Sequence, residues 1–259
     1  MKITVVSPHS GDAALALGLA IEGWLLRGHA VEVICCFTRS EFAPYSDAGS
    51  LHANDRMSFV TAVRRREEET WRRRFGGSKL VVTDLNLKDA PLRLHCSRED
   101  AFGRPADVSE KVVTKIRRAV EQSKGGALVL PLGLSGHVDY VSARNAAMHA
   151  QTVMLPLAFY AEFPFAARME GDRALNDAAG QLPAELQAEL QSVDADLLAQ
   201  ASVDEAVQRK RRIALCYDSQ MNDAVTTEIA ESIRRSNGVE RILANAAWRG
   251  NAVLMQSGE

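Results

Sequence analysis

The first 160 residues alternate short apolar runs with longer segments of helical periodicity, and this alternation constrains the fold more than any other feature. The apolar runs have strand length and occupy residues 3–6, 31–37, 80–83, 128–132 and 155–160. The helix-like segments between them occupy residues 13–27, 54–75, 109–123 and 141–151. Near-continuous apolar runs are typical of parallel strands that are buried on both faces. The pattern therefore predicts an α/β fold with a Rossmann-like, doubly wound and mostly parallel sheet.

The last hundred residues follow a different pattern, because helix-like segments dominate after residue 161. These segments occupy residues 184–191, 204–217 and 224–236, and a closing apolar stretch at 251–256 has the length of a strand. No linker rich in proline, glycine or serine separates this region from the rest of the chain. We therefore expect a single α/β domain over residues 1–259, with a Rossmann-like core (1–160) and a helical C-terminal cap (161–259).

Charge and composition exclude several classes of protein. The formal net charge of −2 gives no electrostatic basis for binding nucleic acid or an anionic membrane. No apolar run approaches the roughly 20 residues that a membrane-spanning helix requires. The four cysteines form no C-x-x-C pair, which fits reduced thiols in the cytoplasm. These features favour a cytoplasmic protein without a nucleic-acid or membrane partner, and they leave the formation of a homo-oligomer open.

Two short loops, at residues 9–12 and 137–140, follow apolar runs, and each carries one histidine and one aspartate. In an open α/β sheet, ligands bind at the carboxyl ends of the strands. We therefore expect His9, Asp12, His137, Asp139 and Tyr140 to meet in one crevice. The same residue types also have structural uses, because a histidine can bond the backbone and an aspartate can cap a helix. A metal or acid–base site and a structural role both remain open for each residue taken alone.

Five stretches within residues 2–220 resemble, in order, the motifs of the PIG-L-like (LmbE-type) zinc-dependent N-deacetylases. They are the loop around His9 and Asp12, the helix-like segment with Arg64 and Glu67, the turn 85–89, the loop 136–140 and the segment 210–220. At the first of these stretches the family typically has Ala or Ser followed by Pro-His-Pro-Asp-Asp-Glu, and at the fourth it has Gly-His-Pro-Asp-His. Each motif is short, but five motifs in the family order indicate a shared fold and descent.

The resemblance implies hydrolysis of a linear amide, namely removal of an acyl group from an N-acylated amino sugar or a similar compound. Zinc would be held by His9, Asp12 and the residue at position 140, and the residue at position 11 would act as general base. His137 would stabilise the oxyanion, Asp139 would orient His137, and Arg64 would bind the substrate. Three protein ligands leave one zinc position for a water molecule, whose pKa the metal lowers.

Three positions depart from the family pattern. Gly11 stands where the family has the general base, and a glycine side chain cannot accept a proton. Tyr140 stands at the third ligand position, where a neutral phenol with a pKa of about 10 is a poor zinc ligand. Ala13 replaces a glutamate that would support the site. Two groups that the standard mechanism needs are therefore absent from their expected positions.

Three interpretations follow from these departures. We favour a degenerate site in a protein that keeps the fold and a crevice for an acylamino-sugar-like ligand, with zinc as the metal if one is retained. The second interpretation is an active amide hydrolase, in which a long loop supplies the missing group. The candidates for that group are Glu41, Asp47, His52, Asp89 and His95. The third interpretation is different chemistry in the same crevice, with iron held through Tyr140 or with no metal.

Overall fold

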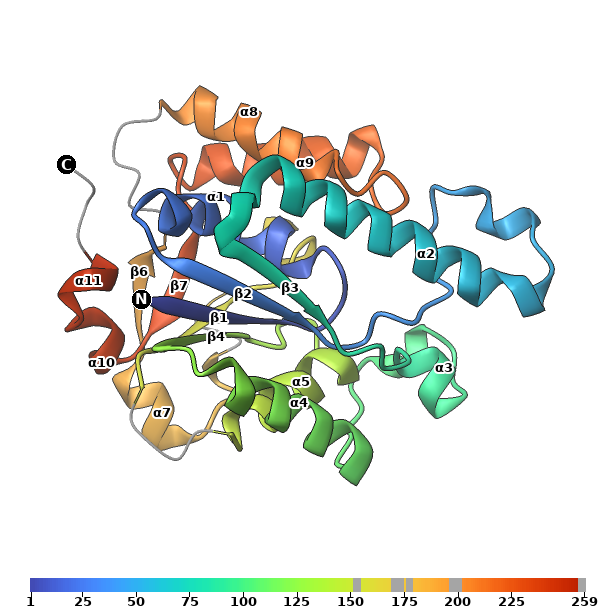
Figure 1. The fold of residues 1–259 in the computed structure, drawn as a ribbon, viewed down its shortest axis with the longest axis horizontal. Helices are drawn as coiled ribbons and strands as arrows, with labels where there is room; N and C mark the ends of the chain where they lie inside the picture. Colours follow the sequence, from blue (N-terminus) through green and yellow to red (C-terminus); the bar gives the residue numbers. More distant parts are fainter. Residues whose placement is uncertain (151–154, 169–174, 176–178, 196–201, 256–259) are drawn as a thin grey trace.

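The computed structural model describes residues 1–150, 155–168, 175, 179–195 and 202–255. Its centre is a seven-stranded sheet with the order β3-β2-β1-β4-β5-β7-β6 (Figure 1). The strands are β1 (Lys2–Ser7), β2 (Ala30–Cys35), β3 (Leu80–Asp84), β4 (Ala127–Pro131), β5 (Leu157–Tyr160), β6 (Gln191–Asp194) and β7 (Arg241–Ala244). Strands β1 to β5 are parallel, whereas β7 pairs antiparallel with both β5 and β6. The predicted α/β fold with a mostly parallel sheet is confirmed.

Helices cover both faces of this sheet. They are α1 (Asp12–Leu26), α2 (Ala53–Trp71), α3 (Ala90–Leu94), α4 (Glu110–Ser123), α5 (Val138–Met148), α7 (Ala184–Glu189), α8 (Val203–Ala214), α9 (Asp223–Arg235), α10 (Ala246–Arg249) and α11 (Ala252–Met255). Helices α1, α2, α8 and α9 lie on one face, and α4 and α5 lie on the other (Figure 1). Buried apolar side chains form one large cluster on each face, which holds the helices against the sheet.

The C-terminal region differs from the sequence-based expectation in two respects. The pattern predicts a helical cap, but β6 and β7 also come from this region and extend the sheet. The expected closing strand at 251–256 is instead the helix α11, whose Leu254 is buried in the core. A short apolar run does not distinguish a strand from a helix by periodicity, which explains the second difference. The strands β6 and β7 have four residues each and carry too little periodicity to be recognised. Residues 151 and 256, where a helix and this strand were expected to end, lie outside the described residues.

The strand order reverses between β1 and β4, which are neighbours in the centre of the sheet. The chain leaves β1 through α1 on one face of the sheet and leaves β4 through α5 on the other (Figure 1). Such a switch point leaves a crevice between the two loops at the carboxyl ends of the strands. Residues 9–12 span the first loop and the start of α1, and residues 137–140 span the end of the second loop and the first turn of α5, so the fold places the two motifs side by side.

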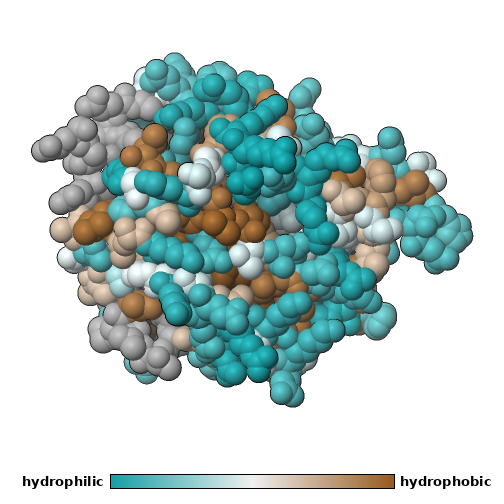
Figure 2. Space-filling view, in the orientation of Figure 1, coloured by the Kyte–Doolittle hydropathy of each residue, from teal (hydrophilic) through white to brown (hydrophobic). Residues whose placement is uncertain are grey.

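The surface over β3, which forms one edge of the sheet, carries both hydrophilic and hydrophobic residues. Figure 2 shows hydrophilic side chains over α2 and α4 and a hydrophobic band between them, where β3 forms the edge of the sheet. Val81 in β3 is 52% exposed there. Among the described residues, no helix is long and apolar enough to cross a membrane.

Candidate functional site

The loop after β1 is held in shape by its own side chains. Ser7 donates a hydrogen bond to the carbonyl of His9 (2.7 Å) and accepts one from the amide of Ala13 (3.1 Å). Gly11 has a φ of +93°, a conformation that residues with side chains rarely adopt. The amide of His9 donates to Asp12 Oδ2 (2.8 Å), so the first residue of α1 folds back over the loop. These contacts bring the His9 and Asp12 side chains next to each other.

The imidazole of His9 lies between two carboxylates. Its Nε2 atom is 3.0 Å from Asp139 Oδ2, and its Nδ1 atom is 3.4 Å from Asp12 Oδ2. Burial by itself would lower the pKa of His9, but the hydrogen bonds and charges of Asp12 and Asp139 raise it to about 9. At neutral pH His9 therefore carries a proton on both ring nitrogens and compensates the negative charge of both aspartates.

The Tyr140 hydroxyl occupies the other side of Asp12. It donates a hydrogen bond to Asp12 Oδ1 over 2.9 Å, and the centroids of the tyrosine and His9 rings are 5.2 Å apart. Burial, reinforced by the charge of Asp12, raises the pKa of Tyr140 well above its ordinary value. A metal ligand has to offer a lone pair, whereas this phenol is protonated and donates to Asp12 Oδ1, which is thereby already occupied. His9, Asp12 and Tyr140 in this arrangement do not fit a zinc ion.

Asp139 is fully buried and is held by several donors. Its Oδ1 atom accepts a hydrogen bond from Arg93 (2.9 Å), and its Oδ2 atom accepts one from the amide of Ala90 (2.9 Å). Burial raises the pKa of a carboxyl group, but the hydrogen bond from His9 and the charge of Arg93 keep the pKa of Asp139 below its ordinary value. Arg93 also donates to Asp107 over 2.6 Å. No sequence motif marks Arg93, although it is the main cationic partner of Asp139 besides His9.

His137 caps α5 and faces the crevice. Its Nδ1 atom accepts the amide hydrogen of Asp139 (3.2 Å), so the neutral ring carries its proton on Nε2. Burial lowers the pKa of His137 to about 4, and the positive charge of His9 adds to this effect. The ring packs edge to face against Phe102 and Tyr140, with centroids 5.0 and 5.8 Å apart. His137 is therefore a neutral hydrogen-bond donor. The resemblance implies that the Asp139 carboxylate orients His137, but in the structure this carboxylate contacts His9.

The two loops open into a cavity of about 330 Å³. Its lining includes the polar residues His9, Asp12, Arg64, Asp89, His137 and Tyr140, and the apolar residues Phe42, Phe163, Phe165 and Met221. All of the predicted site residues line this cavity except Asp139, which lies behind His9 and is fully buried. Among the loop residues considered as replacements for the missing groups, Asp89 lines the cavity. The switch point thus gathers the expected residues around one ligand-sized space.

Arg64 and Asp89 bring one positive and one negative group to this cavity. Arg64 comes from α2, is 6% exposed, and donates from Nη2 to the carbonyl of Ser10 (2.9 Å). Asp89 caps α3 by accepting the amide hydrogen of Leu92 (3.4 Å), and it is also 6% exposed. Neither side chain forms an ion pair with another of the described residues. Both charged groups are therefore available to a ligand in the cavity.

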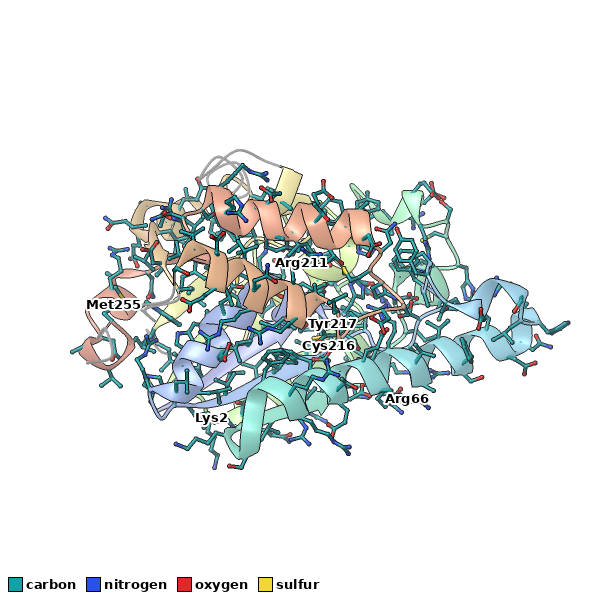
Figure 3. All side chains as sticks on the ribbon, turned by 90° about the horizontal axis from the view of Figure 1, so that it is seen from above. Lys2, Arg66, Arg211, Cys216, Tyr217 and Met255 are labelled. Carbon is teal, nitrogen blue, oxygen red and sulfur yellow. The ribbon has the colours of Figure 1, made fainter. Side chains whose placement is uncertain are left out.

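The space beside Gly11 is filled by Glu68 and Tyr217, to which no role is assigned from the sequence. The Gly11 amide donates to Glu68 Oε2 (2.8 Å), and the Tyr217 hydroxyl donates to the same oxygen (3.3 Å). A Cβ atom on Gly11 would stand 3.1 Å from Cδ1 of Tyr217. Figure 3 shows Tyr217 just beyond the end of α8, where the chain approaches α2. An aromatic ring therefore occupies the volume in which a carboxylate at position 11 would stand.

Glu68 is expected to make the stability of the protein depend on pH. Burial raises the pKa of Glu68 to about 7, although hydrogen bonds from Gly11 and Tyr217 act in the opposite direction. An unfolded glutamate has a pKa of about 4.3, so the folded state holds this proton more tightly. Stability should therefore fall as the pH rises from about 4.3 to about 7. We expect Glu68→Gln to reduce this slope in urea denaturation measured across that range.

The neighbouring residue provides the control for this prediction. Glu69 lies on the outer side of α2, where bonds from Arg72 and Arg73 lower its pKa to about 2. Glu69→Gln should therefore change the pH profile only at more acidic values and leave the slope near neutrality as it is. An equal slope in the wild type and in Glu68→Gln would show that the Glu68 carboxyl does not titrate near neutral pH.

Comparisons with known proteins add information on the fold. No protein-family model matches the sequence, and no curated protein matches it. Teicoplanin deacetylase in complex with teicoplanin superposes with a TM-score of 0.69 at 17% identity, over 94% of this chain and 98% of that chain. N,N'-diacetylchitobiose deacetylase from Pyrococcus horikoshii, complexed with an inhibitor, has a TM-score of 0.61 at 16% identity, over 96% and 85%.

A third solved structure with this fold has a different activity. The 4-carboxy-2-hydroxymuconate hydratase from Pseudomonas putida superposes with a TM-score of 0.57 at 14% identity, over 94% of this chain and 95% of that chain. At such identities a structural likeness establishes the fold and leaves the chemistry to the residues of the site. The chain therefore has the fold of these deacetylases, a fold that a hydratase shares.

Proposed function

We propose that this chain is a PIG-L-like (LmbE-type) deacetylase by descent, and that its hydrolytic zinc site is degenerate. Its crevice would bind a small acylamino-sugar-like molecule without hydrolysing it. One observation carries the proposal: the Tyr140 hydroxyl bonds directly to Asp12 over 2.9 Å, which joins two of the three positions expected to hold zinc. The fold shared with solved deacetylases and the five motifs in family order support the descent.

The network around Asp12 removes what zinc-dependent hydrolysis requires. His9 and Tyr140 each direct a proton at Asp12, so the aspartate is satisfied without a bound cation. A general base has to lie within hydrogen-bond reach of the attacking water. Position 11 offers no such group, and Tyr217 fills the adjacent volume. These residues therefore neither activate a metal-bound water molecule nor remove its proton.

The crevice nevertheless keeps the features of a binding site for a small polar molecule. A cavity of about 330 Å³ lies within the range of ligand sites. Arg64 offers N–H donors and Asp89 offers acceptors, a pair that suits neighbouring hydroxyl groups of a sugar. His137 carries its proton on Nε2 and is able to donate it to an acyl carbonyl oxygen. Phe163 and Phe165 add apolar surface that would cover one face of a sugar ring.

Binding of N,N'-diacetylchitobiose, followed by calorimetry or ligand-observed NMR, tests the proposed crevice. We expect Arg64→Gln and Asp89→Asn each to lower the affinity about tenfold, because a hydrogen bond to a charged group contributes about 1.5 kcal/mol or more. Arg73→Gln is the control, since this side chain is 73% exposed and pairs with Glu69 away from the cavity. Equal affinities for all four proteins, or no binding by the wild type at millimolar ligand, would contradict the proposal.

A second candidate function is a different reaction in the same crevice. The fold is shared with a hydratase, and Asp89 places a buried carboxylate in the cavity where a general base would act. This candidate predicts turnover of a small carbonyl compound that is lost in Asp89→Asn. A variant that still bound its ligand but no longer turned it over would favour this candidate over simple binding.

A further inference from the structure

We propose that His9, His137 and Asp139 form a binding site for a divalent transition-metal ion such as zinc. One donor atom from each of these residues lies within 4.8 Å of the other two. His9 Nε2 and Asp139 Oδ2 are 3.0 Å apart, close to the separation of about 3.3 Å between two ligands of one tetrahedral zinc ion. The site shares only His9 with the set that the resemblance implies, and it does not depend on the proposed function.

The donor set has the composition of a transition-metal centre. Two imidazoles and one carboxylate suit both zinc and ferrous iron. Three protein ligands would leave at least one coordination position open. His9 and His137 line the cavity of about 330 Å³, so water or a ligand atom would reach the open position from there. Asp139 approaches from the buried side and would be the innermost ligand.

The contacts around these three residues resemble the outer contacts of a metal site. A ligating histidine usually donates its other ring N–H to a carboxylate, and His9 Nδ1 lies 3.4 Å from Asp12 Oδ2. Tyr140 holds Asp12 from the opposite side. A ligating carboxylate is usually hydrogen-bonded as well, and Asp139 accepts from Arg93 over 2.9 Å. The contacts of Asp12 with His9 and Tyr140, and the bond from Arg93 to Asp139, would therefore orient His9 and Asp139. The ion would lie on the Nε2 side of the His9 ring, away from Asp12.

Metal binding would release one proton from His9 and replace the hydrogen bond between the Asp139 amide and His137 by coordination of His137 to the ion. The proton between His9 Nε2 and Asp139 would pass to solvent, because a ligating nitrogen needs its lone pair. His137 accepts the amide hydrogen of Asp139 at Nδ1 in this structure. Coordination through its Nε2 would move the ring proton to Nδ1 and break this bond. The backbone amide of Asp139 would then report metal binding by a change in its NMR chemical shift.

Titration of Zn²⁺ and Co²⁺ into chelator-treated protein without a histidine tag tests the site, with calorimetry and visible absorption as readouts. We expect one equivalent of either ion to bind, and we expect His137→Asn to weaken binding at least thirtyfold. Asparagine places Oδ1 where His137 has Nδ1, the atom that caps α5, but it has no atom at the position of Nε2, so this variant separates the lost ligand from a lost helix cap. Tyr140→Phe should change the affinity less than threefold, because Tyr140 is not a ligand here. His149→Ala removes an exposed histidine and is the control.

Each contrary outcome has a distinct meaning. Binding that is lost in Tyr140→Phe and kept in His137→Asn would place the ion at the positions implied by the resemblance. That result would overturn both this proposal and the degenerate zinc site. No binding of either ion to the wild type at micromolar concentration would overturn this proposal alone and leave the proposed function standing. Unchanged affinity in every variant would assign the bound ion to another part of the surface, and it would also overturn the proposal.

Discussion

Replacing Arg93 by alanine is expected to lower the free energy of unfolding by about 3 kcal/mol. Arg93 is 14% exposed and bonds Asp139, whose side chain is fully buried. Its removal would leave the carboxylate with His9 as its ionic partner and would also break the bond to Asp107. Deleting one member of a buried ion pair is costly because the other charge stays desolvated. Urea denaturation at neutral pH measures the effect.

Two further variants show whether burial of the Arg93–Asp139 ion pair is the cause of the expected loss of stability. Arg73→Ala removes an arginine of the same type, but its pair with Glu69 is exposed, and we expect a change of no more than about 0.5 kcal/mol. Arg93→Lys keeps the charge without the planar fork of donors and should lie between the two alanine variants. A loss below about 1 kcal/mol in Arg93→Ala would mean that His9 alone compensates Asp139, which would contradict this description of the network.

Gly11→Asp introduces the carboxylate that the resembling deacetylase motif has at this position, but we expect it to destabilise the protein by about 2 kcal/mol and to add no activity. Gly11 has a φ of +93°, where any side chain is strained. A Cβ atom would also stand 3.1 Å from the Tyr217 ring. Tyr217 is 1% exposed and bonds Glu68, so its ring has little room to move away. Urea denaturation and an acetate-release assay check the two parts of this prediction.

Gly49→Asp is the matched control for the substitution at Gly11. Gly49 lies in an exposed helical turn, η1 (Asp47–Ser50), and a Cβ atom there would meet nothing within 4 Å. We expect its stability to stay within about 0.5 kcal/mol of the wild type. If Gly11→Asp proved equally stable, Tyr217 would have to move aside readily. Restoring a base by a single substitution would then be feasible.

The sequence predicts where the site residues lie in the fold, because a general rule links strand order to the position of ligand sites. The apolar runs that became β1 and β4 predicted buried parallel strands, and the loops after such strands meet at a switch point. The His9 and His137 rings accordingly lie 5.6 Å apart, although 128 positions separate them in the chain. The departures at Gly11 and Tyr140 were also visible in sequence, because they replace residue types that have defined chemical roles.

The partners of the site residues were not predictable in the same way. Arg93, Glu68 and Tyr217 come from α3, α2 and the end of α8, and they meet the two loops only when these elements pack together. No local sequence pattern predicts that Asp139 bonds to His9 and Arg93 instead of orienting His137. The strands β6 and β7 were missed for a related reason, because four-residue strands carry too little periodicity to be recognised.

Acetate release from N,N'-diacetylchitobiose, with and without added Zn²⁺, tests the proposal of a degenerate zinc site most directly. The solved deacetylase from Pyrococcus horikoshii that acts on this compound provides the positive control. We expect the wild-type protein to release no acetate above the background of a heat-denatured sample, whether or not zinc is present. Catalytic release that depends on zinc and stops on chelation would contradict the account, because it would require a general base beside a bound zinc ion in this crevice.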